Sequence, residues 1–264
     1  MKKLSLLLFL FYSSFVFSQD LSLYEKKEFK SNEGVVLPYR ILFPENYDKT
    51  KKYPLVLFLH GAGERGNDNE KQLVHGSKLF VSAENRKNFP AIVIFPQCAK
   101  DSFWASIKVD RTSTPVKRNF NYNEPATAQL SAVMGLLKKL FKEESVNMSK
   151  VYVGGLSMGG MGTFEVVYRN PGLFAAALPI CGGGNVNSYD KKIKKTSFWV
   201  FHGDADAVVP VGLSREMVDK LKSLKANVTY TEYPGVNHNS WDNAFAESTF
   251  MSWMFSKKRK VTKY

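Results

Sequence analysis

The sequence has few of the residues that build metal centres or disulfide frameworks. Its 264 residues include only two cysteines and four histidines. The histidines lack ligand spacing and there is no paired-cysteine motif, so a zinc site is not predicted. A glycine-rich phosphate loop with the Walker pattern is also absent, which argues against a P-loop nucleotide site. We therefore predict neither a metal site nor a P-loop nucleotide site.

Long apolar runs are scarce as well, apart from one at the N-terminus. A basic Lys2-Lys3 pair precedes an apolar stretch over 4–17, which is shorter than the roughly 20 residues of a membrane-spanning helix. Small residues near position 18 fit a cleavage site, and no cysteine follows that would anchor a lipoprotein. We predict a signal peptide over 1–18, a secreted or periplasmic protein without stable membrane insertion after cleavage, and a single domain over 19–264.

Acidic residues are outnumbered by basic ones. The formal net charge is +13, and +11 remains once Lys2 and Lys3 are removed. A basic balance can indicate nucleic acid, an anionic surface or an acidic polymer as partner. Here the lysines are scattered, and the dense cluster is confined to 257–260. We interpret this as a solvated basic surface with a frayed tail and predict no nucleic-acid partner.

Short apolar runs alternate with amphipathic segments along the chain. The run at 55–59 is long enough for a strand and too short for a helix, as in parallel sheets covered on both faces. The clearest helical spacing follows Asn123, which we expect as the N-cap because Glu124 and Pro125 suit a first turn. The predicted strands are 28–31, 35–43, 55–59, 91–95, 151–153, 175–180, 198–201 and 228–233, and the further predicted helices are 158–169, 213–224 and 241–255. This order predicts an α/β fold: a mostly parallel sheet with helices on both faces and a short antiparallel N-terminal hairpin.

The motif Gly155-Leu156-Ser157-Met158-Gly159 follows a predicted strand and opens a predicted helix. That context distinguishes a nucleophile elbow from a chance glycine-rich turn. Glycines are needed there because side chains two residues either side of the serine would collide with the strand or the helix. Ser157 is the predicted nucleophile.

A serine hydroxyl needs a base to take its proton, and four histidines are available. His60 and His202 each end a strand before a glycine, where histidine more often supports a loop through hydrogen bonds. His75 lies in a helical or loop stretch. His238 lies on the loop between the last strand and the final helix, which can bring the imidazole over the serine. We predict His238 as the general base.

The base in turn needs an acid that fixes its tautomer and stabilises the imidazolium. Asp204 is close to the end of a strand and suits a role in holding the loop. Asp206 lies further along, where its carboxylate can reach a histidine of the next loop. We favour Asp206 and keep Asp204 as the alternative. The order serine, aspartate, histidine is the one used by α/β-hydrolases.

An oxyanion also needs donors placed where negative charge develops. The amide of Met158 lies at a helix N-terminus directly after the nucleophile. The second donor should come from the loop after the first core strand, where glycines allow the main chain to approach a substrate. Ala62 is the predicted second amide, with Gly63 as the alternative.

These motifs resemble those of one group of enzymes. The chain is similar, over about 35–255, to the secreted α/β-hydrolases of the polyhydroxybutyrate depolymerase and feruloyl or acetylxylan esterase type. This resemblance implies the α/β-hydrolase fold and an extracytoplasmic esterase that needs no cofactor. It rests on the segments 60–66, 155–160, 181–184, 202–206 and 233–238.

Three functions compete. We prefer a serine carboxylic-ester hydrolase that acts through an acyl-enzyme on small-molecule or polysaccharide esters, either carbohydrate-linked acetyl or feruloyl esters or small carboxylic esters. A polyester is a less favoured substrate. A prolyl-oligopeptidase-like peptidase is the alternative, although such peptidases normally carry a propeller domain, for which this chain has no room. The complete set of serine, histidine and acid argues against a non-catalytic binding protein.

The long segment over 98–122 follows a strand at its carboxyl end, where ligands of open α/β sheets bind. It carries Phe103 and Trp104, which we predict to contact the substrate. Cations lie between the aromatic residues of this segment. Together they suit an aromatic acyl group or a uronic-acid-bearing polysaccharide.

The two cysteines follow strands that we expect to be separated by two central strands. Neighbouring strands lie about 4.8 Å apart, so the gap is roughly 14 Å. A disulfide needs Cα atoms within about 7 Å of each other. Cys98 and Cys181 are therefore predicted to be free thiols near the floor of the pocket.

Overall fold

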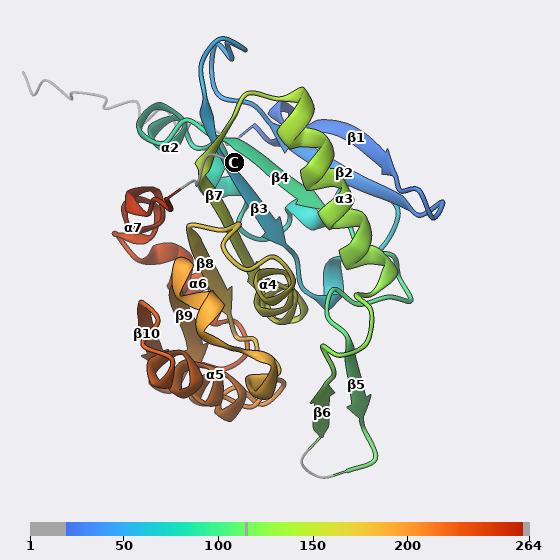
Figure 1. The fold of residues 1–264 in the computed structure, drawn as a ribbon, viewed down its shortest axis with the longest axis vertical. Helices are drawn as coiled ribbons and strands as arrows, with labels where there is room; N and C mark the ends of the chain where they lie inside the picture. The colour runs from blue at the N-terminus through green and yellow to red at the C-terminus, as the bar shows by residue number, and fades with distance from the viewer. Residues whose placement is uncertain (1–19, 114–115, 261–264) are drawn as a thin grey trace, which may run out of the picture.

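An eight-stranded sheet in the order β1-β2-β4-β3-β7-β8-β9-β10 forms the centre of the molecule (Figure 1). The computed structural model describes residues 20–113 and 116–260, so the predicted signal peptide lies outside the described residues. Within those ranges no helix has both the length and the apolar character needed to span a membrane. The strands of the sheet are β1 (Glu25–Lys30), β2 (Val36–Leu42), β3 (Tyr53–Leu59), β4 (Ile92–Pro96), β7 (Val146–Leu156), β8 (Ala176–Ile180), β9 (Ser197–Gly203) and β10 (Val228–Tyr233).

The sheet is antiparallel only on its N-terminal side. β2 pairs in antiparallel fashion with β1 and with β4, whereas every pair from β4 to β10 is parallel. Parallel neighbours need crossover connections, which here contain the helices. The predicted mostly parallel sheet with a short antiparallel hairpin is confirmed.

Helices bury an apolar core on each face of the sheet. On one face, α3 (Ala128–Glu143), α4 (Met158–Arg169) and α5 (Gly212–Ser223) pack against alternate side chains of the strands, and α3 and α4 lie in front of the sheet in Figure 1. On the other face, the core includes residues of α1 (Ser77–Val81), α6 (Ser240–Ala246) and α7 (Phe250–Ser256), with α2 (Ala83–Asn88) directly after α1. The near-continuous apolar runs of the inner strands are explained by this double cover.

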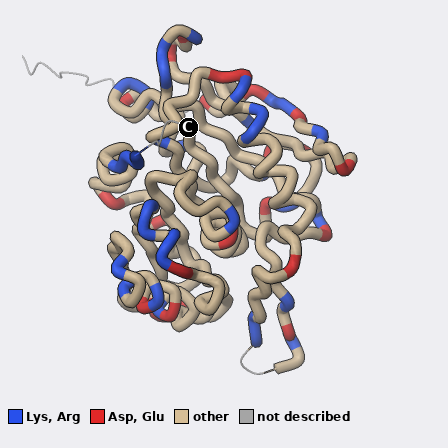
Figure 2. The backbone as a smooth tube through the Cα atoms, viewed as in Figure 1, with Lys and Arg blue, Asp and Glu red and all other residues tan. Residues whose placement is uncertain are grey.

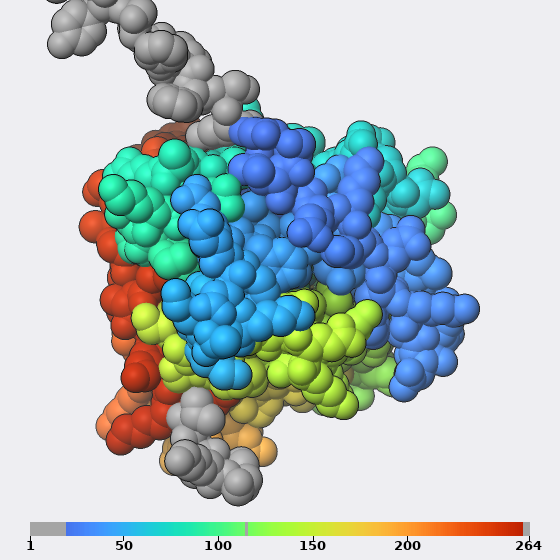
Figure 3. Space-filling view, turned by 90° about the horizontal axis from the view of Figure 1, so that it is seen from above, coloured from blue at the N-terminus to red at the C-terminus, as the bar shows by residue number. Residues whose placement is uncertain are grey.

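The space-filling view shows where the N-terminal and C-terminal elements lie. The N-terminal strands and α3 lie side by side on one face, and the C-terminal segments, coloured red, lie at the edge of that view (Figure 3). A Cβ atom on Gly135 of α3 would lie 3.0 Å from the ring of Phe29 on β1, so these two elements are in close contact. Lys and Arg residues are spread over most elements (Figure 2), which fits the predicted solvated basic surface.

The start of α3 differs from the prediction. Thr127, not Asn123, is the N-cap, and its hydroxyl oxygen accepts the amide of Leu130 at 3.1 Å. The same hydroxyl donates to the carbonyl oxygen of Phe103 at 2.9 Å. The cap is therefore selected by a tertiary contact with the 98–107 loop, in addition to the local preference of threonine for this position.

Two further elements differ from expectation. The predicted helix over 241–255 is two helices, because the chain leaves the helical conformation at Glu247 (φ −60°, ψ 116°). Glu247 there accepts a hydrogen bond from the Tyr233 hydroxyl at 2.9 Å. The segment expected as a loop contains an antiparallel hairpin of β5 (Ile107–Asp110) and β6 (Lys117–Phe120), which projects from the body of the molecule (Figure 1).

Candidate functional site

Ser157 lies at a sharp turn between β7 and α4. Its φ of 53° and ψ of −115° are values that residues other than glycine rarely adopt. A Cβ atom on Gly159 would overlap the carbonyl oxygen of Leu59, and one on Gly155 would approach the Gly159 carbonyl oxygen to 2.5 Å. The motif therefore forms the tight strand-to-helix turn that the sequence predicts.

His238 links Ser157 to Asp206. Its Nε2 lies 2.9 Å from Ser157 Oγ, and its Nδ1 lies 2.8 Å from Asp206 Oδ2. Ser157 follows β7, Asp206 follows β9 and His238 follows β10. The carboxyl ends of these strands lie at the same edge of the parallel part of the sheet. When Nδ1–H donates to Asp206, Nε2 can accept the serine proton, which is the geometry of a general base. The structure thus brings together the three predicted side chains.

Both oxygens of the Asp206 carboxylate are occupied. Oδ1 accepts the amides of Val208 and Val209, each at 2.8 Å, and Oδ2 lies 3.2 Å from His202 Nε2 in addition to His238. Burial is the largest influence and raises the pKa of Asp206, but the hydrogen bonds from both histidines and both amides outweigh it. They hold this pKa well below its usual range. Asp206 is therefore ionised next to the imidazole.

Asp204 holds the loop that carries His238. Its Oδ1 accepts the amide of Gly235 at 2.6 Å. In the same pair of loops, Asn237 Oδ1 accepts the amide of Ala207 at 3.0 Å. These bonds tie the loop after β10 to the loop after β9. Asp204 therefore holds the loop, which is the structural role that the sequence suggested for it.

His60 and His202 support loops, as predicted. The amide of Cys98 donates to His60 Nε2 at 2.9 Å, and His60 Nδ1 lies 2.6 Å from the carbonyl oxygen of Gly61. Burial lowers the pKa of His60 to about 4, so this ring is neutral at pH 7. His202 is fully buried, and its Nδ1 lies 2.7 Å from Ser214 Oγ. Neither ring occupies the position of a base for Ser157.

The two predicted oxyanion amides lie at the starts of helices. Met158 is the first residue of α4, and Ala62 is the first residue of the short 3₁₀ helix η2 (Ala62–Glu64) that follows β3. The first amides of a helix have no acceptor within it. A Cβ atom on Gly61 would lie 2.9 Å from the Leu156 side chain, so the turn before η2 packs against the end of β7. Met158 thus follows Ser157 directly, and Ala62 lies on a segment that packs against the residue before Ser157. Their role as oxyanion donors is proposed below.

Trp104 requires a correction. Its side chain is fully buried, and its indole N–H donates to the carbonyl oxygen of His60 at 3.0 Å. A Cβ atom on Gly162 of α4 would approach it to 2.5 Å. Because it has no exposed surface, Trp104 cannot contact a substrate directly, and it instead fixes the 98–107 loop onto α4. Phe103 is half-buried and remains a prediction as a substrate contact.

Both cysteines are free and buried, which confirms the prediction. β4 and β8 are separated by β3 and β7. The sulfur of Cys181 lies within 4.8 Å of a carboxylate oxygen of Asp206 and of a ring nitrogen of His238. Burial raises the pKa of the Cys181 thiol to about 12, so it is a neutral group beneath the site. Its position follows from the sheet order, since β8 lies between the strands that precede Ser157 and Asp206.

Trp241 was missed by sequence analysis. Its ring lies between two histidines, with centroid distances of 5.4 Å to His238 and 5.1 Å to His75. The feature of the sequence that could have indicated this role was its place in the first turn of the helix that follows His238. An aromatic wall of the site therefore comes from α6.

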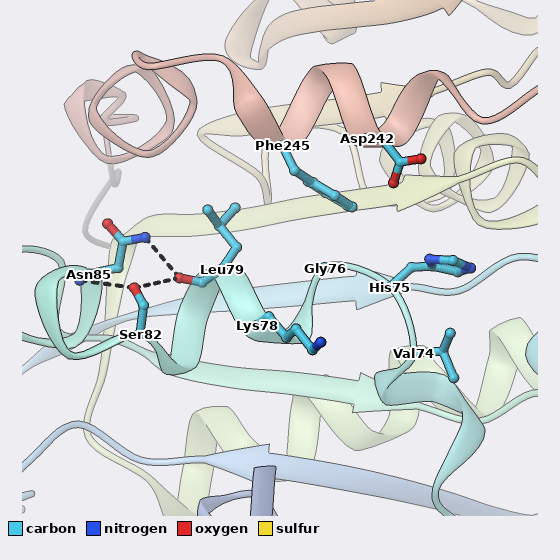
Figure 4. A pocket seen from close by; sticks show the side chains of 9 residues that line it. All are labelled: Val74, His75, Gly76, Lys78, Leu79, Ser82, Asn85, Asp242 and Phe245. Atoms are coloured by element: carbon cyan, nitrogen blue, oxygen red, sulfur yellow. Dashed lines mark hydrogen bonds between the residues drawn. The ribbon is translucent and has the colours of Figure 1, made fainter. Parts of the chain in front are cut away.

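A cavity of about 300 Å³ is lined by His75 together with residues of α1 and α6. Figure 4 shows His75 and Asp242 at one end of the cavity and Leu79 near Phe245 further along it. The cavity has both apolar and charged lining groups. His75, which lines the cavity, contacts Trp241, and Trp241 in turn contacts His238.

Comparisons with known proteins place the chain in a protein family. A family model described as phospholipase/carboxylesterase matches residues 46–252. Acyl-protein thioesterase 1 of Neurospora crassa is 26% identical over 204 residues, which cover 70% of this chain and 80% of that protein. Probable feruloyl esterase C of Aspergillus terreus is 24% identical over 184 residues, which cover 69% of this chain and 59% of that protein.

Two solved structures extend the comparison. A thermostable esterase is 37% identical with a TM-score of 0.81, and the match covers 90% of this chain and 64% of that one. A ferulic acid esterase from Anaeromyces mucronatus, solved with ferulic acid, is 17% identical with a TM-score of 0.62 and covers 87% and 91% of the two chains. The second likeness shows the fold alone.

Proposed function

Because the chain belongs to the phospholipase/carboxylesterase family of esterase-type hydrolases, we propose that it is a serine carboxylic-ester hydrolase that acts through an acyl-enzyme. One observation carries the proposal: the His238 ring lies 2.9 Å from Ser157 Oγ and 2.8 Å from Asp206 Oδ2. A serine hydroxyl becomes a nucleophile when such a base takes its proton.

In the first half of the reaction, Ser157 Oγ attacks the ester carbonyl carbon while His238 Nε2 takes the hydroxyl proton. Asp206, held ionised by its hydrogen bonds, stabilises the resulting imidazolium. The amides of Met158 and Ala62 stabilise the negative oxygen of the tetrahedral intermediate. When that intermediate collapses, His238 gives its proton to the leaving alcohol and the acyl group remains on Ser157.

In the second half, a water molecule replaces the alcohol. His238 takes a proton from the water as its oxygen attacks the acyl carbon. The new tetrahedral intermediate collapses, the proton passes to Ser157 Oγ, and the carboxylic acid is released. These steps use only water and the side chains and amides described above.

For the substrate, we propose carbohydrate-linked acetyl or feruloyl esters, or small carboxylic esters. The similarity to a feruloyl esterase supports this class. Half-buried Phe103, near the turn that carries Ala62, is the proposed aromatic contact for the substrate.

We also propose that residues 1–18 are a cleaved signal peptide and that 19–264 form one catalytic domain, active in a secreted or periplasmic location. The basic n-region and the short apolar stretch support this proposal. N-terminal sequencing of protein recovered from outside the cytoplasm should begin near Gln19. An N-terminus at Met1 in that protein would contradict it.

The function is tested with a panel of esters: acetyl-xylan, feruloyl-arabinoxylan, short p-nitrophenyl esters and polyhydroxybutyrate. Ser157→Ala should lower kcat by about 10⁴-fold or more on every ester that the wild type hydrolyses. A fluorophosphonate should label the wild type and not the variant. Activity on peptide amides without activity on p-nitrophenyl esters, or no labelling of the wild type, would refute the proposal.

A further inference from the structure

Two arginines near the candidate site have no acidic partner. Arg65 follows the turn that carries Ala62, and Arg118 lies on β6. The ion pairs of arginine in the described part of the chain are made by Arg86, Arg169 and Arg215, and no carboxylate oxygen lies within 4.0 Å of either Arg65 or Arg118. Neither guanidinium therefore has a carboxylate in direct contact among the described side chains.

Arg65 is held next to one of the proposed oxyanion amides. Its Nε donates to the carbonyl oxygen of Ala62 at 3.0 Å, and its Nη1 donates to that of Ser102 at 3.2 Å. The guanidinium carbon lies 5.1 Å from the centre of the Phe103 ring. A guanidinium has five N–H donors, so these two bonds leave donors available for a ligand.

The β5–β6 hairpin has one half-buried face and one exposed face. The half-buried face carries the register pairs Ile107 with Phe120 and Val109 with Arg118. At the base of this face, Ile107 and Phe120 pack against a small cluster that includes Val209. The amide of Val209 donates to Asp206, so the base of this face lies close to the carboxylate of the site.

Two contacts fix the hairpin in this position. Ser106, directly before β5, donates from its amide at 2.6 Å and from its hydroxyl at 2.9 Å to buried Glu165 of α4. Arg118 Nη2 donates to the carbonyl oxygen of Val208. The amide of the same Val208 donates to Asp206, so Arg118 and Asp206 are bound to opposite sides of one residue.

The surroundings of Arg118 are positively charged. The segment 98–120 contains five Lys or Arg residues and two aspartates, and Figure 2 shows basic residues on the hairpin. Of those aspartates, Asp110 accepts hydrogen bonds within its own turn, from the amide and hydroxyl of Thr112. Asp206 attracts Arg118 electrostatically, which raises the pKa of Arg118, but among the described residues it forms its ion pairs with His202 and His238. Burial of Arg118 lowers its pKa, which marks the desolvation that an incoming anion would offset.

We propose that Arg118, with Arg65, selects esters that carry a carboxylate on the acyl or the alcohol part near the scissile bond. The inference rests on the proposed esterase function and narrows it to anionic esters. A planar guanidinium forms short charge-assisted hydrogen bonds to a carboxylate, so each arginine can bind one carboxylate oxygen or both. Arg118 is the residue to test, because replacing Arg65 would also remove its bond to Ala62, whose amide is one of the proposed oxyanion donors.

The test uses two matched substrate pairs. For the acyl part, p-nitrophenyl hemisuccinate is compared with p-nitrophenyl butyrate. For the alcohol part, 4-acetoxybenzoate is compared with 4-acetoxybenzamide. The measured quantity is the ratio of kcat/KM for the anionic ester to that for its neutral partner. In at least one pair, Arg118→Gln should lower this ratio about tenfold, which is the effect of losing one charge-assisted hydrogen bond.

Lys108→Gln is the control, because Lys108 lies on the exposed face of the same hairpin and should leave the ratio as in the wild type. Arg118→Lys keeps the charge but not the planar fork, so it should give an intermediate ratio even if the glutamine variant folds poorly. An unchanged ratio in both pairs for Arg118→Gln and Arg118→Lys, with neutral esters still hydrolysed, would overturn this inference alone. Absence of hydrolysis of all four esters by the wild type would overturn the esterase function with it.

Discussion

Replacing Asp206 with asparagine isolates the role of the carboxylate from its role in folding. The side-chain oxygen of asparagine can still accept the amides of Val208 and Val209, which lie 2.8 Å from Oδ1. The amide NH₂ of asparagine would then face His238 Nδ1. An NH₂ group donates and does not accept there, so the ring must carry its own proton on Nε2.

The size of the effect follows from that tautomer. A proton on Nε2 points at Ser157 Oγ, 2.9 Å away, and prevents His238 from accepting the serine proton. The variant also lacks the negative charge that stabilises the imidazolium. We expect kcat to fall by about 10⁴-fold, which corresponds to about 5.4 kcal/mol of transition-state stabilisation.

The assay is the hydrolysis of a short p-nitrophenyl ester at pH 7 to 8, with circular dichroism to verify the fold. Asp204→Asn is the matched control, because its oxygen can still accept the Gly235 amide, now 2.6 Å from Asp204 Oδ1. The control should keep kcat within about tenfold of the wild type. A folded Asp206→Asn variant with kcat within tenfold of the wild type would refute the assignment of the acid, and a 10⁴-fold loss in the control would assign that role to Asp204.

Three further predictions concern stability and thiol chemistry. Gly159→Ala should prevent the elbow from forming, because its Cβ would overlap the Leu59 carbonyl oxygen; we expect a loss of more than about 3 kcal/mol in urea unfolding, and a loss below 1 kcal/mol would contradict the packing of the turn. The pKa of Asp206 in the folded protein lies below the unfolded value of about 3.9, so its ionisation stabilises the fold above that pH. This contribution is lost as the pH falls toward the folded pKa. The free energy of unfolding, measured between pH 6 and 3, should therefore differ less between wild type and Asp206→Asn at the acid end. Cys98 and Cys181 should react with a thiol reagent only after denaturation, and two equivalents should then be found; none would mean that they are oxidised.

The central part of the site could be predicted because its constraints are local. The glycines around Ser157 follow from the space between a strand and a helix. The strand ends before Asp206 and His238 place both side chains at the same edge of a parallel sheet. The choice between Asp204 and Asp206 depended on which one reached further along its loop, and the hydrogen bonds agree with the longer reach.

The segment over 98–122 could not be predicted to the same degree. An aromatic residue in a loop of the sequence can be a buried anchor or an exposed contact, and Trp104 is the former because its indole N–H has a backbone acceptor inside the molecule. β5 alternates between apolar and charged residues over only four positions, and three of the four residues of β6 are polar, so the pattern is too short to mark a hairpin in the sequence. The start of α3 depended on a loop that sequence analysis had not placed.

The position of β10 has a consequence for how the protein loses activity on heating. β10 is an edge strand with β9 as its one neighbour in the sheet, and the loop after it carries His238. Edges and surface loops open at lower free energy than the centre of a sheet. Separation of this edge would break the hydrogen bonds between the two loops and move the imidazole away from Ser157. Activity should therefore be lost some degrees below the melting temperature of the sheet. The temperature at which hydrolysis stops would then measure the separation of β10 from β9.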